Sequence, residues 1–244
     1  MTKYSAPSVL YHSLSGMVSK LELEVALSAA SASLDLGHVN SIVNAFFKNT
    51  KICVTGVPYI KIQGLSSILR TGSSGAERPL VYQGLAGIVS PAEIVNIDGF
   101  EHISGPTLVG LIHARIHFKS GATKQYLNIA LDLYTRIINL AAVRDLKDVF
   151  LGEIDNNRPY LKSERITRYG ISCCELSGSS FDHPNQVEFS HIESVVVNPM
   201  KALDVDNGLI VLKGIHLELT RKQIHTYEQL YDFCAENGYS TNWA

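Results

Sequence analysis

Cysteine is scarce in this sequence, with 4 in 244 residues, and none of the four has the spacing of a zinc site. Cys173 and Cys174 are adjacent, and no Cys-x-x-Cys or Cys/His pair of the zinc-finger type occurs. We therefore expect no metal site and no cofactor, and free thiols in a reducing compartment. The first ten residues contain one lysine and no apolar run typical of a signal peptide, so the predicted location is the cytoplasm.

Long hydrophobic runs and an excess of one charge are also missing. The longest apolar stretch, residues 127–143, is interrupted by Asn128, Asp132 and Arg136, which make it too polar to cross a bilayer. The 21 basic and 23 acidic residues give a formal net charge of −2. A balanced charge creates no overall field that attracts a phosphate polymer. We therefore expect no membrane partner, and nucleic acid is an allowed partner rather than a favoured one.

Complete catalytic motifs are missing as well. The sequence has no Gly-x-Ser-x-Gly elbow and no His-Glu-x-x-His motif. Residues 71–79, TGSSGAERP, contain the glycine and serine of a phosphate-binding loop but lack its Gly-Lys-Ser/Thr ending. Backbone amides of such a loop can hold an anion, although this composition is more typical of a flexible surface loop. The missing motifs favour a protein that is not an enzyme.

The sequence does contain enough apolar material for a large core. Its mass of 26.8 kDa and its 45% of hydrophobic residues fit one large domain or two compact lobes. The order of strand-like and helix-like patterns predicts an α+β fold, with mostly antiparallel sheets and flanking helices. Because residues 156–168 are polar and contain Asn-Asn-Arg-Pro, we divide the chain into lobes 1–155 and 156–244. One continuous domain is the alternative.

Two patterns stand out in the N-terminal lobe. Apolar residues recur at helical spacing over residues 36–49, which predicts an amphipathic helix. Leucine and valine alternate with polar residues over residues 19–29, which predicts a strand, with a helix as the alternative. A bent or edge strand is predicted over 52–62, and residues 90–93 are the predicted start of a helix. Further along, the patterns predict a β-hairpin of strands 107–118 and 127–133, and then a helix over 134–151.

The C-terminal lobe is predicted to consist of strands closed by one C-terminal helix. The strand-like runs are residues 166–176, 187–197 and 209–219, and polar loops separate them. The last helix begins near residue 227 and ends at Gly238. Its predicted inward-facing residues are Tyr227, Leu230, Tyr231 and Phe233.

Four histidines are candidates for chemistry. His113 and His117 lie four apart in a predicted strand, about 13 Å from each other, so they are too distant to share a metal ion unless the segment is helical. His191 and His216 lie in separate predicted strands, each with a glutamate two residues later. Such a pair can supply the base and the acid of phosphodiester cleavage. The hydroxyl residue that two-histidine phosphoesterases carry two positions after each histidine is absent, so surface positions of a sheet explain these residues equally well.

Basic residues form two clusters in the C-terminal lobe. They are candidate anion-binding residues if the fold brings the clusters together. Charge that keeps a linker and a helix soluble is the simpler explanation. The first cluster is Lys162, Arg165 and Arg168, and the second is Lys213, Arg221 and Lys222.

The sequence thus favours a non-catalytic binding or regulatory protein of the cell interior that acts through protein–protein contacts. We expect a protein partner or self-association, in an oligomer or a complex. One alternative is a histidine-dependent hydrolase of nucleotides or phosphodiesters, with His191 and His216 as the catalytic pair. The other is an accessory protein that binds nucleic acid through the two basic clusters.

Overall fold

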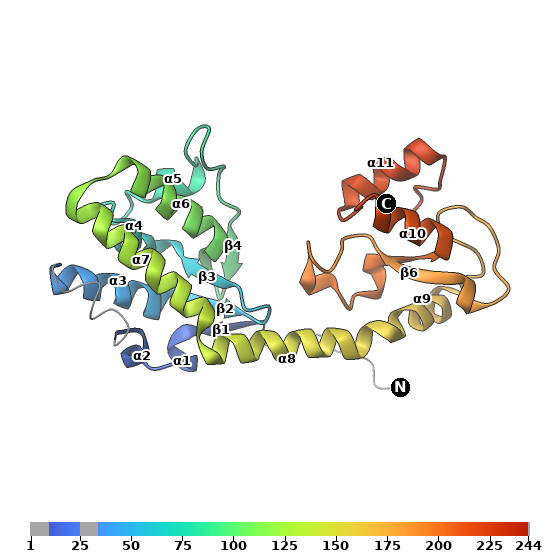
Figure 1. The fold of residues 1–244 in the computed structure, drawn as a ribbon, viewed down its shortest axis with the longest axis horizontal. Coiled ribbons are helices and arrows are strands. Elements are labelled where there is room, and N and C mark those ends of the chain that lie inside the picture. Colours follow the sequence, from blue (N-terminus) through green and yellow to red (C-terminus); the bar gives the residue numbers. More distant parts are fainter. Residues whose placement is uncertain (1–9, 25–33, 244) are drawn as a thin grey trace. The chain divides into compact units, whose positions relative to one another are not determined.

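The computed structural model of the chain describes residues 10–24 and 34–243. Over this range the chain divides into two compact units between Phe150 and Leu151, inside helix α8 (Ala141–Asn157). Each unit combines strands and helices (Figure 1), so the predicted α+β fold class is confirmed. Among the described helices, none has both the length and the apolar content needed to cross a membrane.

The N-terminal unit contains a five-stranded sheet in the order β1-β2-β3-β5-β4. Every neighbouring pair is antiparallel, as the sequence predicted. Ile52, Ile60 and Ile103, on three successive strands of the sheet, are fully buried. The strands are β1 (Tyr11–Ser13), β2 (Thr50–Cys53), β3 (Pro58–Lys61), β4 (Val95–Ile97) and β5 (Phe100–Ser104).

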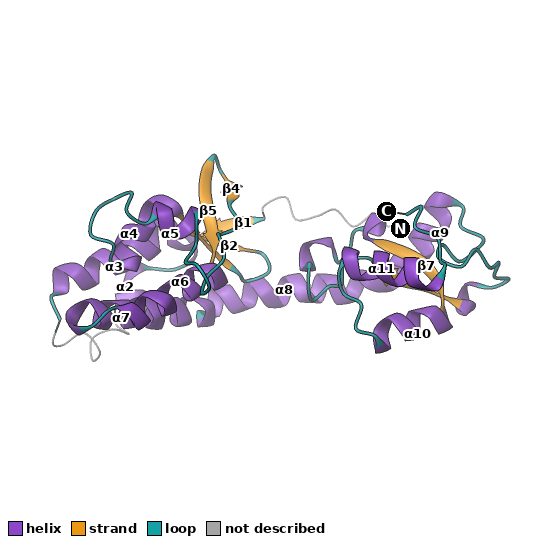
Figure 2. Cartoon of the chain, turned by 90° about the horizontal axis from the view of Figure 1, so that it is seen from above, coloured by secondary structure: helices purple, strands orange, loops and turns teal. Residues whose placement is uncertain are grey.

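Helices bury this sheet and complete the core of the N-terminal unit (Figure 2). The helix over residues 36–49 was predicted correctly: Asp35 accepts a hydrogen bond from the His38 N–H at 2.9 Å, and Ile42 and Phe46 are fully buried. The cap satisfies a backbone donor that the first turn leaves open. The helices are α1 (Leu14–Met17), α2 (Lys20–Glu24), α3 (Leu36–Asn49), α4 (Leu65–Leu69), α5 (Arg78–Tyr82), α6 (Gly105–Phe118) and α7 (Gly121–Asn139).

The predicted β-hairpin over residues 107–133 is wrong, because this segment forms the helix pair α6 and α7. Ser104 caps α6 by accepting the Thr107 N–H, and Pro106 lies in the first turn, where its missing N–H costs nothing. The many β-branched residues suggested strands, but Leu108, Leu111 and Ile112 recur at helical spacing and are fully buried. Core packing outweighs their strand propensity.

Three further predictions in this unit are wrong. Lys20–Glu24 is helical, with an ion pair of 2.8 Å between its two end residues; the rest of the predicted strand 19–29 lies largely outside the described residues. Residues 52–62 form two strands, because Gly56 turns the chain with φ of 80°. Residues 90–94 are not helical, and the Ala92 N–H donates to the Val81 carbonyl at 2.8 Å instead.

The C-terminal unit is a two-stranded antiparallel sheet of β6 (Val187–His191) and β7 (Gly208–Leu212), packed with helices α9 (Leu161–Tyr169), α10 (Lys213–Arg221) and α11 (Tyr227–Asn237). Leu209 and Val211 of β7 pack with α10 and α11, through Ile215, Leu230 and Phe233. The second side of the sheet carries Phe189 and His191, which alternate with Ser190 along β6.

Two predictions fail in this unit. Residues 156–168 are not a linker, because they continue through α8, a 3-10 turn (Arg158–Tyr160) and α9. The strand predicted over 166–176 is therefore absent, and Arg165 on α9 pairs with Glu175 in the loop that follows. The other two strands are shorter than predicted, since α10 begins at Lys213 directly after β7.

The C-terminal helix was predicted correctly. Thr226 and Gln229 form a capping box at its start, and Gly238 ends it in the left-handed conformation with φ of 65°. Leu230 and Phe233 are buried, but Tyr227 and Tyr231 are 40% and 43% exposed, so these two do not face inward as expected.

Candidate functional site

Asn207 holds the loop between β6 and β7 in place. Its side chain is 5% exposed, and its Oδ1 accepts the Glu193 N–H at 3.0 Å. Its Nδ2 donates to the carbonyls of Glu193 at 2.9 Å and Lys201 at 3.1 Å. Three hydrogen bonds from one buried amide fix both ends of the loop relative to each other. The loop follows directly after His191, the last residue of β6, which pairs with Gly208 of β7.

His191 is held by a backbone carbonyl and an aromatic ring. Its Nε2 lies 2.8 Å from the carbonyl of Ala202. A carbonyl only accepts, so Nε2 carries the proton and Nδ1 is the acceptor nitrogen of the neutral ring. The Phe189 ring meets the His191 ring edge to face at 5.1 Å. Phe189 in turn lies against Gly208, where a Cβ atom would come within 2.1 Å of the phenyl ring.

A cavity of about 370 Å³ opens beside β6. Its volume is in the range of sites that bind small molecules. Side chains from α8, the following turn, α9, β6 and α10 surround it. The lining residues are Asp155, Arg158, Pro159, Lys162, Glu188, Phe189 and His216.

The two basic clusters of the sequence meet at Glu188. Lys162 of the first cluster lies 3.5 Å from one carboxylate oxygen, and Lys213 of the second lies 3.7 Å from the other. Lys162 also donates to the Val187 carbonyl at 3.1 Å. Arg158 is exposed, and within the described residues it has no carboxylate at ion-pair distance. The cavity therefore has one guanidinium that is not neutralised by a direct ion pair.

The pKa values of His191 and His216, the two histidines near the cavity, lie below the ordinary value. Burial lowers the pKa of His216, and the charge of Arg158 lowers it further, against the opposing effect of Glu188. Burial likewise lowers the pKa of His191, against the opposing effect of the Ala202 hydrogen bond, and Arg158 and His216 lower it slightly further. Since the ordinary pKa is 6.5, both rings are neutral at pH 7. A neutral imidazole can accept a proton, which is the property of a general base.

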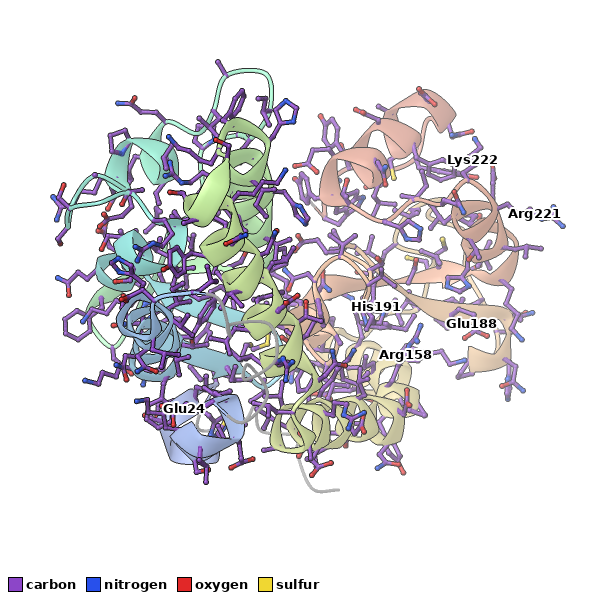
Figure 3. The ribbon with its side chains drawn as sticks, turned by 60° about the vertical axis from the view of Figure 1, so that its left-hand side comes forward. Glu24, Arg158, Glu188, His191, Arg221 and Lys222 are labelled. Atoms are coloured by element: carbon purple, nitrogen blue, oxygen red, sulfur yellow. The ribbon has the colours of Figure 1, made fainter. Side chains whose placement is uncertain are left out.

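The remaining basic candidates lie elsewhere. Arg165 makes a bidentate pair with Glu175, at 2.9 and 2.7 Å, so its guanidinium is committed to the fold. Arg168 and Lys222 pair with glutamates one turn away on their own helices. Figure 3 shows Arg221 and Lys222 well separated from Arg158 and His191. Of the six predicted anion-binding residues, the structure brings Lys162 and Lys213 to the cavity region.

Arg158 and Asp155 are cavity residues that the sequence analysis missed. Arg158 lies in the segment expected to be a linker and Asp155 lies directly before it. Within that segment only the basic cluster of Lys162, Arg165 and Arg168 was singled out. The helical pattern that runs from α8 into α9 is the signal that could have placed them, because it brings residues 155, 158 and 162 to one side at spacings of three and four.

His113 and His117 are four residues apart on α6, not on a strand. This is the geometry that would allow a shared metal ion, yet within residues 10–24 and 34–243 no group of three or more His, Cys, Asp or Glu side chains is arranged to hold one. Both histidines are exposed. They are best described as surface residues of α6.

No protein-family model matches this chain, and neither the curated proteins nor the solved structures include a match.

Proposed function

We propose that the C-terminal unit hydrolyses phosphodiesters at the cavity lined by Arg158, Lys162 and His216. The observation that supports this proposal is the meeting, at one cavity, of two cationic side chains and a neutral imidazole from two segments of the chain that are far apart in the sequence. Cations that hold a phosphate beside a group that can take a proton are the components that this reaction needs. A substrate in this class is a nucleic acid or a smaller nucleotide diester.

Arg158 and Lys162 bind the phosphate in this proposal. Arg158 has the planar guanidinium that donates two parallel hydrogen bonds to phosphate oxygens. The ammonium group of Lys162 lies 3.5 Å from the Glu188 carboxylate, so a bound phosphate competes with that carboxylate for it. Lys213 keeps Glu188 partly neutralised at 3.7 Å, which reduces its repulsion of the incoming anion.

His216 is the proposed general base. It lines the cavity, and within the described part of the chain its ring makes no hydrogen bond, so a ring nitrogen is available for a water molecule. The ring takes a proton from that water as its oxygen attacks phosphorus. The bond from phosphorus to the leaving oxygen breaks, and the leaving oxygen takes a proton from solvent. Arg158 and Lys162 stabilise the added negative charge of the transition state.

His191 has a supporting role in the proposal. It is not among the residues that line the cavity, but it is electrostatically coupled to His216. Its Nε2–H is committed to the Ala202 carbonyl at 2.8 Å. A positive charge on His191 would disfavour protonation of His216, so the neutral His191 allows His216 to take up the proton.

The test is hydrolysis of bis(4-nitrophenyl) phosphate and of fluorescently labelled DNA and RNA oligonucleotides, in buffers with EDTA, Mg²⁺ or Mn²⁺. His216→Ala should lower the rate by about 10²–10⁴-fold, the usual contribution of a general base. His225→Ala is the matched control, since His225 is an exposed histidine of the same unit outside the cavity lining. Equal rates for the wild type and His216→Ala, or no hydrolysis in any buffer, would refute the proposal.

A non-catalytic role in protein–protein contacts is the second candidate. The observation that favours it is a group of exposed apolar side chains in the loop between β6 and β7: Val196 is 88% exposed, Val197 49% and Met200 41%. Apolar side chains of this size in water are typical of contact surfaces. Native mass spectrometry tests self-association, and a dimer that Val196→Asp converts to a monomer would support this candidate.

The cytoplasm is the compartment that we propose for either function. Cys173, Cys174 and Cys234 are free thiols, and Cys173 is exposed to solvent. An exposed thiol persists most readily where the medium is reducing.

A further inference from the structure

The N-terminal unit has a cavity of its own, of about 330 Å³, that the proposed hydrolysis does not use. One wall is the TGSSGAERP loop, which the sequence analysis weighed as an anion cradle, and the others are the end of β3, α5 and the turn between β4 and β5. The residues that line it include Lys61, Glu77, Arg78, Tyr82, Phe100 and Glu101.

Two cations at this cavity lack a carboxylate partner. Among the residues that the structure describes, Lys61 and Arg78 have no acidic group at ion-pair distance. Lys61 instead lies over the ring of Phe100, with its ammonium 3.1 Å from the ring centre. The acidic Glu101 is engaged elsewhere, since it accepts a hydrogen bond from the Tyr82 hydroxyl at 2.6 Å. Glu77 and Glu101 also line the cavity, but neither forms a direct ion pair with Lys61 or Arg78, so both cations remain able to contact an anionic group.

The same cavity has a buried hydrogen-bond acceptor. Glu77 lines it although the residue is only 2% exposed. One oxygen of Glu77 accepts the Gly75 N–H at 2.9 Å, and no other hydrogen bond or ion pair to its carboxylate occurs within the described residues. A buried carboxylate with a single partner is costly to the fold. An N–H group of a bound molecule would supply a second partner.

We propose that this cavity binds a nucleoside monophosphate whose base carries an exocyclic amino group. Lys61 and Arg78 bind the phosphate, the Glu77 carboxylate accepts the amino N–H, and the base lies beside the aromatic rings of Phe100 and Tyr82. A nucleoside phosphate carries the anion, the flat ring and the N–H donor that these groups match, and the cavity volume is in the range of a small-molecule site. The proposal is independent of the hydrolysis proposed for the C-terminal unit.

Isothermal titration calorimetry of the full chain with AMP, GMP, CMP and UMP tests the proposal. AMP, GMP or CMP should bind at least about tenfold more tightly than UMP, because uracil offers Glu77 only its ring N3–H, which is flanked by two carbonyl oxygens that the carboxylate repels. Arg78→Ala should weaken that binding by about 10–100-fold, the effect of losing a charge-assisted hydrogen bond. Glu77→Gln should reduce the preference over UMP, because the glutamine amide accepts the amino N–H without the charge of the carboxylate.

Two controls keep the result specific. Lys162→Ala removes a cation from the C-terminal cavity and should leave this binding unchanged, which separates the two sites. Arg78 is exposed, so Arg78→Ala gives a folded protein for comparison even if the buried Glu77→Gln does not fold, and circular dichroism checks both variants. Binding that is equal for UMP, that inorganic phosphate matches in affinity, or that Arg78→Ala leaves intact would overturn the proposal.

Discussion

The side-chain amide of Asn207 pairs with both backbone groups of Glu193, accepting its N–H at 3.0 Å and donating to its carbonyl at 2.9 Å. Asn207→Ala leaves these partly buried backbone groups without their partner. We expect a loss of about 2–4 kcal/mol in the free energy of unfolding of the C-terminal unit. Trp243, the single tryptophan, belongs to that unit and reports its urea unfolding by fluorescence.

Asn198→Ala is the matched control for this prediction. The Asn198 amide reaches Glu193 only at 3.5 Å, the outer limit of a hydrogen bond. Its replacement should change the free energy of unfolding by less than about 1 kcal/mol. Equal effects of the two substitutions would show that Asn207 does not hold the loop.

Gly208 is needed for close packing rather than for backbone freedom. A Cβ atom there would lie 2.1 Å from the Phe189 ring, whereas Gly214 on α10 has nothing within 4 Å of the same position. We expect Gly208→Ala to destabilise the C-terminal unit by about 1–3 kcal/mol, because the ring must move. Gly214→Ala should be neutral or stabilise α10 by up to about 1 kcal/mol. The urea midpoint of unfolding, followed by Trp243 fluorescence, compares the two variants. An unchanged midpoint in Gly208→Ala would contradict the close packing of Gly208 against Phe189.

The lowered pKa values of His191 and His216 predict how the stability of the C-terminal unit depends on pH. Burial lowers both pKa values below 6.5 in the folded state, so the unfolded chain binds protons more readily in mildly acidic solution. Their contribution to stability is therefore complete above pH 6.5 and is lost as the pH falls from there through the folded pKa values. Urea unfolding at a series of pH values measures this slope. It should become shallower in His191→Ala and His216→Ala, and an unchanged slope in both would exclude these groups as its origin.

Arg165 should matter for stability and not for anion binding. Its pair with Glu175 is 12% and 16% exposed at the two side chains, and it also donates to the Val205 carbonyl at 3.0 Å. Arg165→Ala should lower the free energy of unfolding by about 2–4 kcal/mol, because it leaves the largely buried Glu175 carboxylate without its ion-pair partner. Arg168→Ala, on the same helix but with an exposed partner, should cost less than about 1 kcal/mol. Reduced phosphate affinity in a fully stable Arg165→Ala protein would contradict this assignment.

The sequence predicted the elements whose signals are local. The helices over 36–49 and 227–237 were found because their apolar spacing is regular and Gly238 marks the end of the second. The helix pair α6 and α7 was missed because β-branched residues such as Ile112 and Ile116 suit strands locally. Their helical form depends on a core assembled from distant segments, which no local pattern contains.

The candidate sites were predictable only in their parts. The sequence singled out Lys162 and His216 individually, but their shared cavity depends on how α9 and α10 pack against β6. Arg158 was overlooked because no helix was expected over residues 156–168, so nothing related Arg158 to Lys162 one turn later. The cavity of Glu77 and Arg78 had only one visible sign, the glycine-rich loop, since burial of a carboxylate cannot be inferred from composition.

Within the described residues, the two strands of the C-terminal sheet have no further strand beside them, so each would expose backbone groups that another chain could pair with. At Ile210 of β7 both groups are already occupied: its N–H donates to the Glu175 carboxylate at 2.6 Å, and its carbonyl accepts the Glu175 N–H at 2.8 Å. On β6, Lys162 occupies the Val187 carbonyl. These contacts protect the sheet from edge-to-edge aggregation, and a chain that extended it into a fibril would first have to displace Glu175 and Lys162.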